Sequence, residues 1–433
     1  RMVFAHPTLA GLCRELSLLQ RGVFEPMALV DRDRPLPLSY SQQRLWYIHQ
    51  LEGGSAQYHL PTALRLHGDV DIKALQGSFD RIVERHEILR TVYQTIDGKP
   101  MQRVLPARAA TIACTDLSGA AESISAEALA DLLRADALRP FDFGRDLMLR
   151  VHVFTLAPRE HVLLCTLHHI ASDGWSMGVL THELATLYRE LAQGSAESLP
   201  PMTVQYGDFA VWQRAPAQVQ KLDEQLAYWT TQLAELPPVH SLPLDRPRSQ
   251  EPCYDGGSHR QVLDGSLTAA VKDFARDCDA TLFMCLQSVL SVVLMRWGNA
   301  REIAIGSPVA GRSRGDLDAS IGLYVNTLVF RHVMGDESTF RQAVVRSRRL
   351  ALDAYAHQDV PFEMLVEALR PARSLNLSPL FQVMFVLQNN EHVEFELAGI
   401  QVEGMELGAA QTKFDLSLSI REVDGQLGLH WSY

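Results

Sequence analysis

The sequence predicts an α/β protein of two comparable lobes, with a ligand site where the lobes meet. Its 433 residues exceed the size of one ordinary domain. Apolar runs typical of strands alternate with segments of helical periodicity in both halves of the chain. The stretch "AESLPPM" (196–202) is the clearest internal boundary. Because ligand sites favour the junctions between structural units, we expect the site between the lobes.

The first half is expected to contain two helices and several strands. Asp71 is a capping residue before an amphipathic helix, and Gly194 ends a second helix that starts after the motif described below. The last two strand segments are so apolar that burial on both faces is indicated. The expected strands are "TALRLHG" (62–68), "ILRTVY" (88–93), "MQRVLP" (101–106), "LMLRVHVFTL" (147–156) and "HVLLCTLHHI" (161–170).

The second half has a similar mixed content. Helices are expected over 219–235, 266–277, 281–297 and 339–357. Because the chain stops within a strand pattern, we expect the native domain to continue past its last residue. The expected strands are "SHRQVLD" (258–264), "EIAIGSPVAG" (302–311), "IGLYVNTLVFRHV" (321–333), "LFQVMFVL" (380–387), "EFELAGIQVEGMEL" (394–407), "KFDLSLSI" (413–420) and "QLGLHWSY" (426–433).

Composition excludes several classes of function. The net charge of −11, without a basic run, argues against a nucleic-acid surface. The longest apolar stretch (282–298) is interrupted by polar residues, so no membrane span is expected, and the N-terminus has no signal-peptide pattern. The six cysteines show neither CxxC pairs nor metal-like spacing. These features predict a reduced, cytoplasmic protein.

The segment "TLHHIASDGW" (166–175) carries the strongest indication of chemistry. His168 and His169 end a buried strand and Asp173 begins the next helix, a turn at which α/β scaffolds present reactive groups. Successive strand residues point to opposite faces, so only one histidine faces a cavity. The alternatives are a helix cap for the aspartate and a core position for a histidine. A metal site is disfavoured because no third ligand accompanies the pair.

Other segments place this motif in a family. They are "LSYSQQRLWYIHQL" (38–51), "RHEILRTVY" (85–93), "YGDFAVWQ" (206–213), "IGLYVNTLVFR" (321–331), "HQDVPFE" (357–363) and "RSLNLSPLFQVMF" (373–385). Together with "HHIASDG" (168–174), they resemble the ordered motifs of the condensation domains of non-ribosomal peptide synthetases, whose signature is HHxxxDG. The resemblance covers the chain from about residue 36 to its end.

The resemblance implies a specific architecture. The family fold consists of two chloramphenicol-acetyltransferase-like lobes in a V-shaped pseudo-dimer with a tunnel between them. The N-terminal lobe is expected over 36–200 and the C-terminal lobe over 201–433. The segment "VFAHPTLAGLCREL" resembles the last helix of a peptidyl carrier domain, so 1–16 is expected to be the tail of an upstream carrier and 17–35 a linker.

The resemblance also implies a reaction and its partners. The α-amine of an aminoacyl thioester on a downstream acceptor carrier attacks the thioester of an upstream donor carrier, and a peptide bond forms. The 4'-phosphopantetheine arms come from these carriers, and the chain itself binds no cofactor. An adjacent adenylation domain and a monomeric state within a larger synthetase are expected. The motifs resemble the subclass that takes an L-configured donor.

Residue roles follow from the matched motifs. By resemblance His169 is the catalytic residue, which either accepts a proton from the attacking amine or steers that amine. His168 is expected to pack beneath the loop. Asp173 is expected to form a buried salt bridge, with Arg85 as the first choice of partner and Arg90 as the second.

Further residues are assigned to the site by the same resemblance. The Gly174 amide is expected to face the oxyanion. Trp175 is interpreted as packing at the tunnel, and Gln42 as part of the tunnel wall. Asn326 is placed near the reaction centre, with a backbone-bonded strand end as the alternative. Ser307 is expected to line the acceptor side, within the segment "GSPVAGR" (306–312) that bridges the second lobe to the first.

Four rival functions fit these motifs less well. An epimerisation domain shares the histidine motif but uses a distinct glutamate, and the segments "SQQRLW" and "VNTLVFR" favour condensation. A heterocyclisation domain would replace the histidines with a DxxxxD pattern. A non-catalytic recruitment module of the same fold typically loses the motif, which is intact here. A stand-alone acyltransferase is disfavoured by the carrier-like N-terminus.

Overall fold

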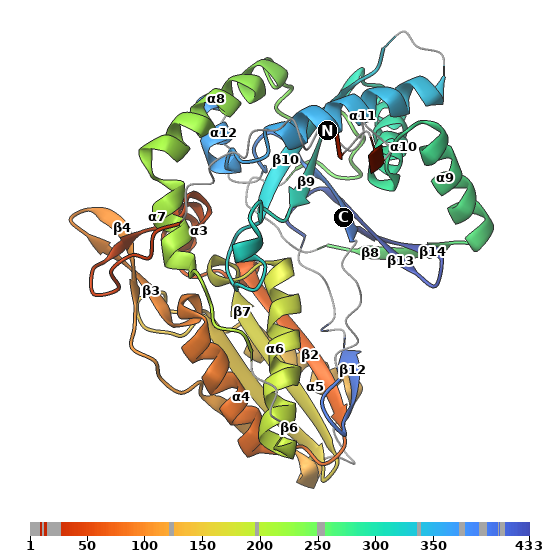
Figure 1. The fold of residues 1–433 in the computed structure, drawn as a ribbon. Coiled ribbons are helices and arrows are strands. Elements are labelled where there is room, and N and C mark those ends of the chain that lie inside the picture. The colour runs from red at the N-terminus through yellow and green to blue at the C-terminus, as the bar shows by residue number, and fades with distance from the viewer. Residues whose placement is uncertain are drawn as a thin grey trace.

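In the part of the chain that it describes, the computed structural model contains two large sheets, each packed against helices, and one small sheet (Figure 1). The structure describes residues 27–120, 125–194, 199–248, 256–335, 339–371, 377–388, 396–405 and 412–433, together with 9–10, 13–14 and 407. The predicted carrier tail (1–16) therefore lies largely outside the described residues, although 9–10 and 13–14 are helical and exposed.

A mixed five-stranded sheet forms the first lobe. Only its β5–β6 pair is parallel. Its order is β12 (Gln401–Met405), β2 (His59–His67), β7 (Glu160–His168), β6 (Leu149–Ala157) and β5 (Ile112–Asp116). A smaller sheet beside it has the order β1 (Leu36–Pro37), β4 (Lys99–Val104) and β3 (Thr91–Ile96).

Helices cover both faces of the five-stranded sheet. Side chains from α4 and α6 pack on one face of β7, and those of α5 pack on the other, where Leu133 meets Val162 and Leu164. This burial on both faces confirms what the apolar run of β7 predicted. The first-lobe helices are α3 (Tyr40–Glu52), α4 (Ile72–Arg85), α5 (Ala126–Ala137), α6 (Gly174–Gln193) and α7 (Tyr206–Gln213).

Local capping signals place the two long helices as expected. The carboxylate of Asp71 accepts from the amides of Lys73 and Ala74 at the start of α4. Gly194 ends α6 in the left-handed region, with φ of 69°, where a glycine carries no side-chain penalty. Both helix boundaries therefore agree with the sequence prediction.

The second lobe is built on a mixed six-stranded sheet. Two of its neighbouring pairs, β9–β11 and β11–β13, are parallel. Its order is β10 (Asn326–Val333), β9 (Glu302–Val309), β11 (Val383–Gln388), β13 (Leu416–Val423), β14 (Gln426–Ser432) and β8 (Ser258–Leu263). Its helices are α8 (Pro216–Gln232), α9 (Gly265–Asp277), α10 (Leu282–Trp297), α11 (Phe340–Ala356) and α12 (Phe362–Leu369).

Two described segments from the second half of the chain are built into the first lobe. β12 comes from the second half of the chain but pairs with β2 at the edge of the first-lobe sheet (Figure 1). The connection between β9 and β10 buries Leu317, Ile321 and Leu323 in the first-lobe core. α7 also packs into that core, beyond the predicted boundary at residue 200. The hydrophobic core of the first lobe therefore includes residues from both halves.

The described part of the predicted linker is held against the first lobe. Arg32 pairs with Asp208 and with Glu87, each at 2.7 Å, and Met27 is buried. Among the described helices, none alone is long and apolar enough to cross a membrane. α9 and α10 satisfy the length and composition test only as a pair, bent by 102°.

Candidate active site

The paired histidines lie at the end of the central strand of the first lobe. β7 ends at His168, and the chain makes a short 3₁₀ turn over His169–Ala171 before Asp173 caps α6. The Nδ1 atom of His169 lies 2.8 Å from the carbonyl oxygen of Ser172. A carbonyl oxygen can only accept, so Nδ1 carries the proton and Nε2 is left as an acceptor.

The two histidines have different environments, as strand alternation predicts. His168 is buried, and its Nδ1 accepts from the Ile170 amide at 3.0 Å. Its ring packs edge-on against Phe143, with centroids 4.7 Å apart, and more loosely against Phe141. Burial holds the pKa of His168 well below its usual range. His168 therefore packs beneath the loop, whereas His169 faces open space.

His169 lines a cavity of about 810 Å³ between the lobes. Both lobes contribute to its wall: α3 and the turn before β2 on one side, and the strand ends and α12 on the other. Polar and charged members of the lining are Ser41, Arg44, Gln57, Tyr58, His169, Asn326, Thr327, Glu363, Ser378, Thr412, Lys413, Asp415 and Tyr433. The cavity therefore lies where the sequence predicts a site, at the junction of the lobes.

A lysine that no sequence pattern marks as functional faces the same cavity. The segment beginning at Lys413 was interpreted only as a strand, and no local pattern marked its first residue as functional. Burial, and next the Lys413 charge, lower the pKa of His169 to about 4. Desolvation within the cavity wall lowers the pKa of Lys413 to about 8, although water reaches its side chain. At neutral pH the imidazole is therefore uncharged and the lysine largely protonated.

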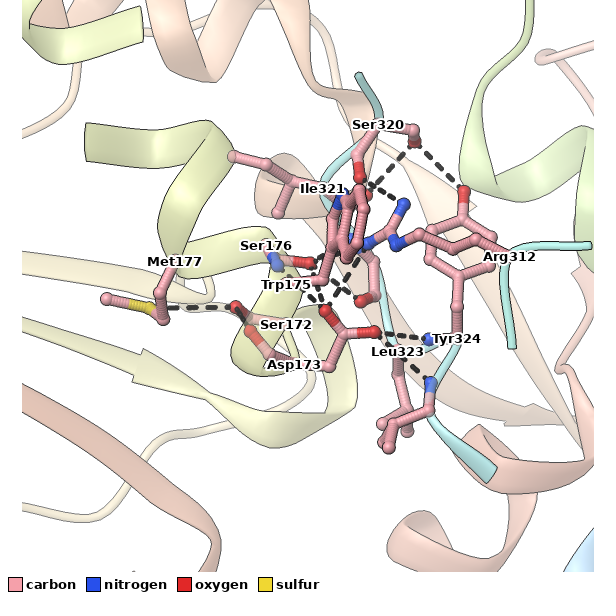
Figure 2. A network of polar contacts seen from close by, with 12 residues as sticks. Ser172, Asp173, Trp175, Ser176, Met177, Arg312, Ser320, Ile321, Leu323 and Tyr324 are labelled. Atoms are coloured by element: carbon pink, nitrogen blue, oxygen red, sulfur yellow. Dashed lines mark hydrogen bonds and ion pairs between the residues drawn. The ribbon is translucent and has the colours of Figure 1, made fainter. Parts of the chain in front are cut away.

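Asp173 binds backbone and side-chain groups of both lobes (Figure 2). Its Oδ1 accepts from the Ser176 amide at 2.9 Å and from the Ser176 hydroxyl at 2.7 Å. Its Oδ2 accepts from the amides of Tyr324 and Val325, at 3.0 and 3.1 Å. The buried guanidinium of Arg312 lies 3.3 Å from Oδ1. The aspartate is thus both a helix cap and a bridge to the second lobe.

The predicted arginine partners of Asp173 lie elsewhere. Arg85 pairs with Glu183 at 2.8 Å, and His86 contacts the other oxygen of that carboxylate at 2.7 Å. Arg90 donates to backbone carbonyls of α4. The prediction that Arg85 or Arg90 pairs with Asp173 is therefore wrong. The partner comes from the segment 306–312, which was expected to bridge the lobes.

Asn326 lies on the cavity wall and is bonded to backbone. Its side-chain amide donates to the carbonyls of Gln358 and Val360, at 2.8 and 2.7 Å. Its oxygen accepts from the amides of Thr327 and Phe362. The interpretation of Asn326 as a backbone-bonded strand end is confirmed, because it fixes the start of α12 to β10. Its place near the reaction centre stays a prediction.

Two residues predicted to line the site are instead buried away from it. The Ser307 hydroxyl donates to the carbonyl of Phe385 at 2.7 Å, within the second-lobe sheet. Gln42 is fully buried and donates to the Ile170 carbonyl at 3.3 Å. The predictions that Ser307 and Gln42 line the tunnel are wrong. Strand and helix periodicity turned both side chains inward, and Gln42 supports the loop that carries His169.

The remaining motif residues lie beside the cavity and do not line it. The Trp175 indole donates to the carbonyl of Asp318 at 2.9 Å, but the side chain is 40% exposed, so its expected packing at the tunnel is not seen. Gly174 is exposed in the first turn of α6 and is absent from the cavity wall. Within the described ranges, no three His, Cys, Asp or Glu side chains are grouped to hold a metal ion.

The fold and the site define a class of protein: a two-lobed α/β domain with a histidine in the cavity between its lobes. Comparison with known proteins identifies the family. The family model described as "Condensation domain" matches residues 33–433. The chain belongs to the Condensation domain family.

Curated relatives are non-ribosomal peptide synthetases. The chain is 44% identical over 435 residues to CymA of Salinispora arenicola (strain CNS-205), a probable synthetase, covering 99% of this chain and 6% of that protein. It is 38% identical over 428 residues to the dimodular nonribosomal peptide synthase of Bacillus subtilis (strain 168), covering 97% of this chain and 18% of that protein. The chain therefore spans a small part of the length of these relatives.

Solved structures agree on the fold. The X-domain from teicoplanin biosynthesis has a TM-score of 0.85 at 27% identity, over 94% of this chain and 92% of that one. The four-domain non-ribosomal peptide synthetase AB3403 has a TM-score of 0.81 at 23% identity, over 97% of this chain and 32% of that one. The chloramphenicol-acetyltransferase-like two-lobe prediction is confirmed.

Proposed function

We propose that this domain forms a peptide bond between two carrier-bound substrates. The α-amine of an aminoacyl thioester on a downstream carrier attacks the thioester of an upstream carrier, and the lengthened chain stays on the downstream carrier. The observation that carries the proposal is the His169 ring, which lines the cavity between the lobes with Nε2 as an acceptor. The match to the Condensation domain family supports the same reaction.

The geometry favours a steering role for His169. An imidazole whose pKa lies near 4 is a weak base, so it accepts a hydrogen bond from the amine more readily than it removes a proton. The Ser172 carbonyl fixes the ring, so Nε2 has a set direction. Because a thioester is already activated, orientation of the amine supplies much of the acceleration.

The partners follow from the reaction. We propose that donor and acceptor carrier domains bring their 4'-phosphopantetheine arms to the cavity, and that an adenylation domain loads the acceptor. The family match and the longer synthetase relatives support these partners. The opening motif "SYSQQRLW" (39–46) supports an L-configured donor.

The test is the mass of the acceptor carrier after incubation of the protein with both loaded carriers. Condensation adds the donor mass to the acceptor, and L-loaded donors react faster than D-loaded donors. Inversion of the acceptor residue without added mass, detected by chiral chromatography of the released amino acid, would instead indicate epimerisation. Carrier binding without either change would favour a recruitment module. The His169→Ala variant is the matched control for chemistry at this site.

A further inference from the structure

Lys413 extends from the second lobe across the cavity to the first. It lies three residues before β13, and its Nζ is 4.3 Å from the centroid of the Tyr58 ring, which precedes β2 of the first-lobe sheet. Both residues line the cavity that holds His169. The ammonium therefore lies inside the space between the lobes.

The carboxylates on this cavity wall are committed to other cations. Glu363 pairs with Arg44 at 3.5 Å. Asp415 pairs with His240 and Arg248, and it is this pairing that holds the pKa of Asp415 near 2. Over the described ranges of the chain, no carboxylate lies within ion-pair distance of Lys413.

The aromatic face satisfies the ammonium only in part. The face of a ring attracts a cation, but it provides no hydrogen-bond acceptors for the three N–H donors of the ammonium. No hydrogen-bond acceptor contacts Nζ in the part of the chain that the structure describes. Its N–H groups are therefore available to whatever enters the cavity.

Two groups of opposite hydrogen-bonding character thus face one reaction space. His169 is held neutral and offers an acceptor, and Lys413 is held protonated and offers donors. The pKa of His169 is about 4 and that of Lys413 is about 8. At neutral pH the imidazole can therefore accept a hydrogen bond while the ammonium donates one. The other charged groups at this wall, Arg44, Glu363 and Asp415, are paired with each other or with neighbours outside the cavity.

We propose that Lys413 is a further catalytic residue, whose ammonium donates a hydrogen bond to the thioester carbonyl oxygen as that oxygen becomes an oxyanion. This inference rests on the proposed peptide-bond formation. Preorganised donors aimed at developing charge are among the largest single contributions to catalysis of acyl transfer.

The step is balanced without any further reactant. The amine lone pair forms the C–N bond while the carbonyl π electrons move to oxygen. The oxyanion then re-forms the carbonyl as the C–S bond breaks. The leaving sulfur departs as a thiol with the proton that the amine loses, and Lys413 keeps its proton throughout. The assignment replaces the Gly174 amide, which does not line the cavity.

Substitution of Lys413 tests the assignment. We expect Lys413→Met to lower the single-turnover rate at saturating carriers by about 100-fold, with the KM for each carrier changed less than about threefold. Lys413→Arg should recover at least a tenth of the rate, since a guanidinium also donates. Lys73→Met, which removes an exposed lysine of α4, is the charge-matched control. If Lys413 were only structural, its loss would not lower the rate while leaving KM nearly unchanged, and Lys413→Arg would not restore the rate.

A binding measurement separates this inference from the proposed function. Two pantetheine derivatives are titrated by calorimetry, one with a ketone and one with an anionic phosphonate in place of the thioester carbonyl. Wild type should bind the phosphonate at least tenfold more tightly, and Lys413→Met should lose that preference. Equal binding by wild type, or a preference retained in Lys413→Met, overturns the role of Lys413. If neither derivative binds wild type, the proposed function itself fails.

Discussion

The carboxylate of Asp173 in the first lobe lies 3.3 Å from the guanidinium of Arg312 in the second, and both side chains are about 1% exposed. Each group has further partners. Asp173 accepts from the amides of Tyr324 and Val325, and Arg312 donates to the carbonyl of Ser320 at 2.8 Å. The ion pair therefore fixes the loop before α6 against the connection between β9 and β10, and so holds the His169 loop at the lobe junction.

Breaking this pair should destabilise the fold and leave the carboxylate buried without its cation. We expect Arg312→Met to lower the free energy of unfolding by about 3 kcal/mol. A double-mutant cycle with Asp173→Ala, measured by urea unfolding, should give a coupling energy of about 2 kcal/mol. The matched cycle of Asp173 with Arg85 should give a coupling near zero, since Arg85 pairs with Glu183. Coupling to Arg85 as large as that to Arg312 would contradict this geometry.

Removal of His168 should mainly lower the stability of the fold, whereas removal of His169 should mainly lower product formation. His169→Ala loses one hydrogen bond to Ser172, so its free energy of unfolding should fall by only about 1 kcal/mol. Its product formation should fall about 100-fold. His168→Ala leaves a cavity against Phe141 and Phe143 and should cost about 3 kcal/mol. Unfolding curves and acceptor-carrier mass are measured on both variants. A large loss of stability in His169→Ala together with a large loss of product in the stable His168→Ala variant would contradict these assignments.

Asn326 should act on the position of α12. Asn326→Ala removes the bonds to the carbonyls of Gln358 and Val360, and should cost about 2 kcal/mol of unfolding free energy. Asn326→Asp should cost more, because a carboxylate would face those two carbonyl oxygens. Urea unfolding of the two variants checks the order. A milder effect of the aspartate would show that the amide donors are not needed.

Acid should destabilise the protein through its buried neutral histidines. Burial lowers the pKa of His59 and His168, and it lowers the pKa of both His169 and His332 to about 4. Below pH 6.5 the unfolded chain binds protons that these rings do not bind in the fold, so stability is lost as pH falls from 6.5 towards 4. Each fully shifted ring contributes a slope of about 1.4 kcal/mol per pH unit in this window.

His332 gives the cleanest test of that slope. Its Nε2 has no hydrogen-bond partner among the described residues, and it lies outside the cavity of His169. His332→Leu should reduce the slope of unfolding free energy between about pH 6 and 5 by about 1 kcal/mol per unit. His182→Leu, which removes an exposed histidine of α6, is the matched control for the loss of a histidine. If the slope of unfolding free energy against pH is the same in His332→Leu as in wild type, the pKa of His332 does not differ between the folded and unfolded states.

Much of the architecture could be predicted from local sequence. The apolar run of β7, the caps at Asp71 and Asp173, and the stop at Gly194 each depend on residues within a single element and its ends. Strand alternation likewise predicted that only one histidine of the pair faces a cavity. Such patterns are set by backbone geometry and by burial of one face, which neighbouring residues encode.

The tertiary structure alone decided which distant groups meet. Arg312 lies 139 residues from Asp173, and β12 leaves the second half of the chain to pair with the first-lobe sheet. Lys413 reaches the same cavity as His169 from a segment whose local pattern predicts only a strand. Partner choice across such separations depends on how two lobes pack, and periodicity within one element carries no information about it.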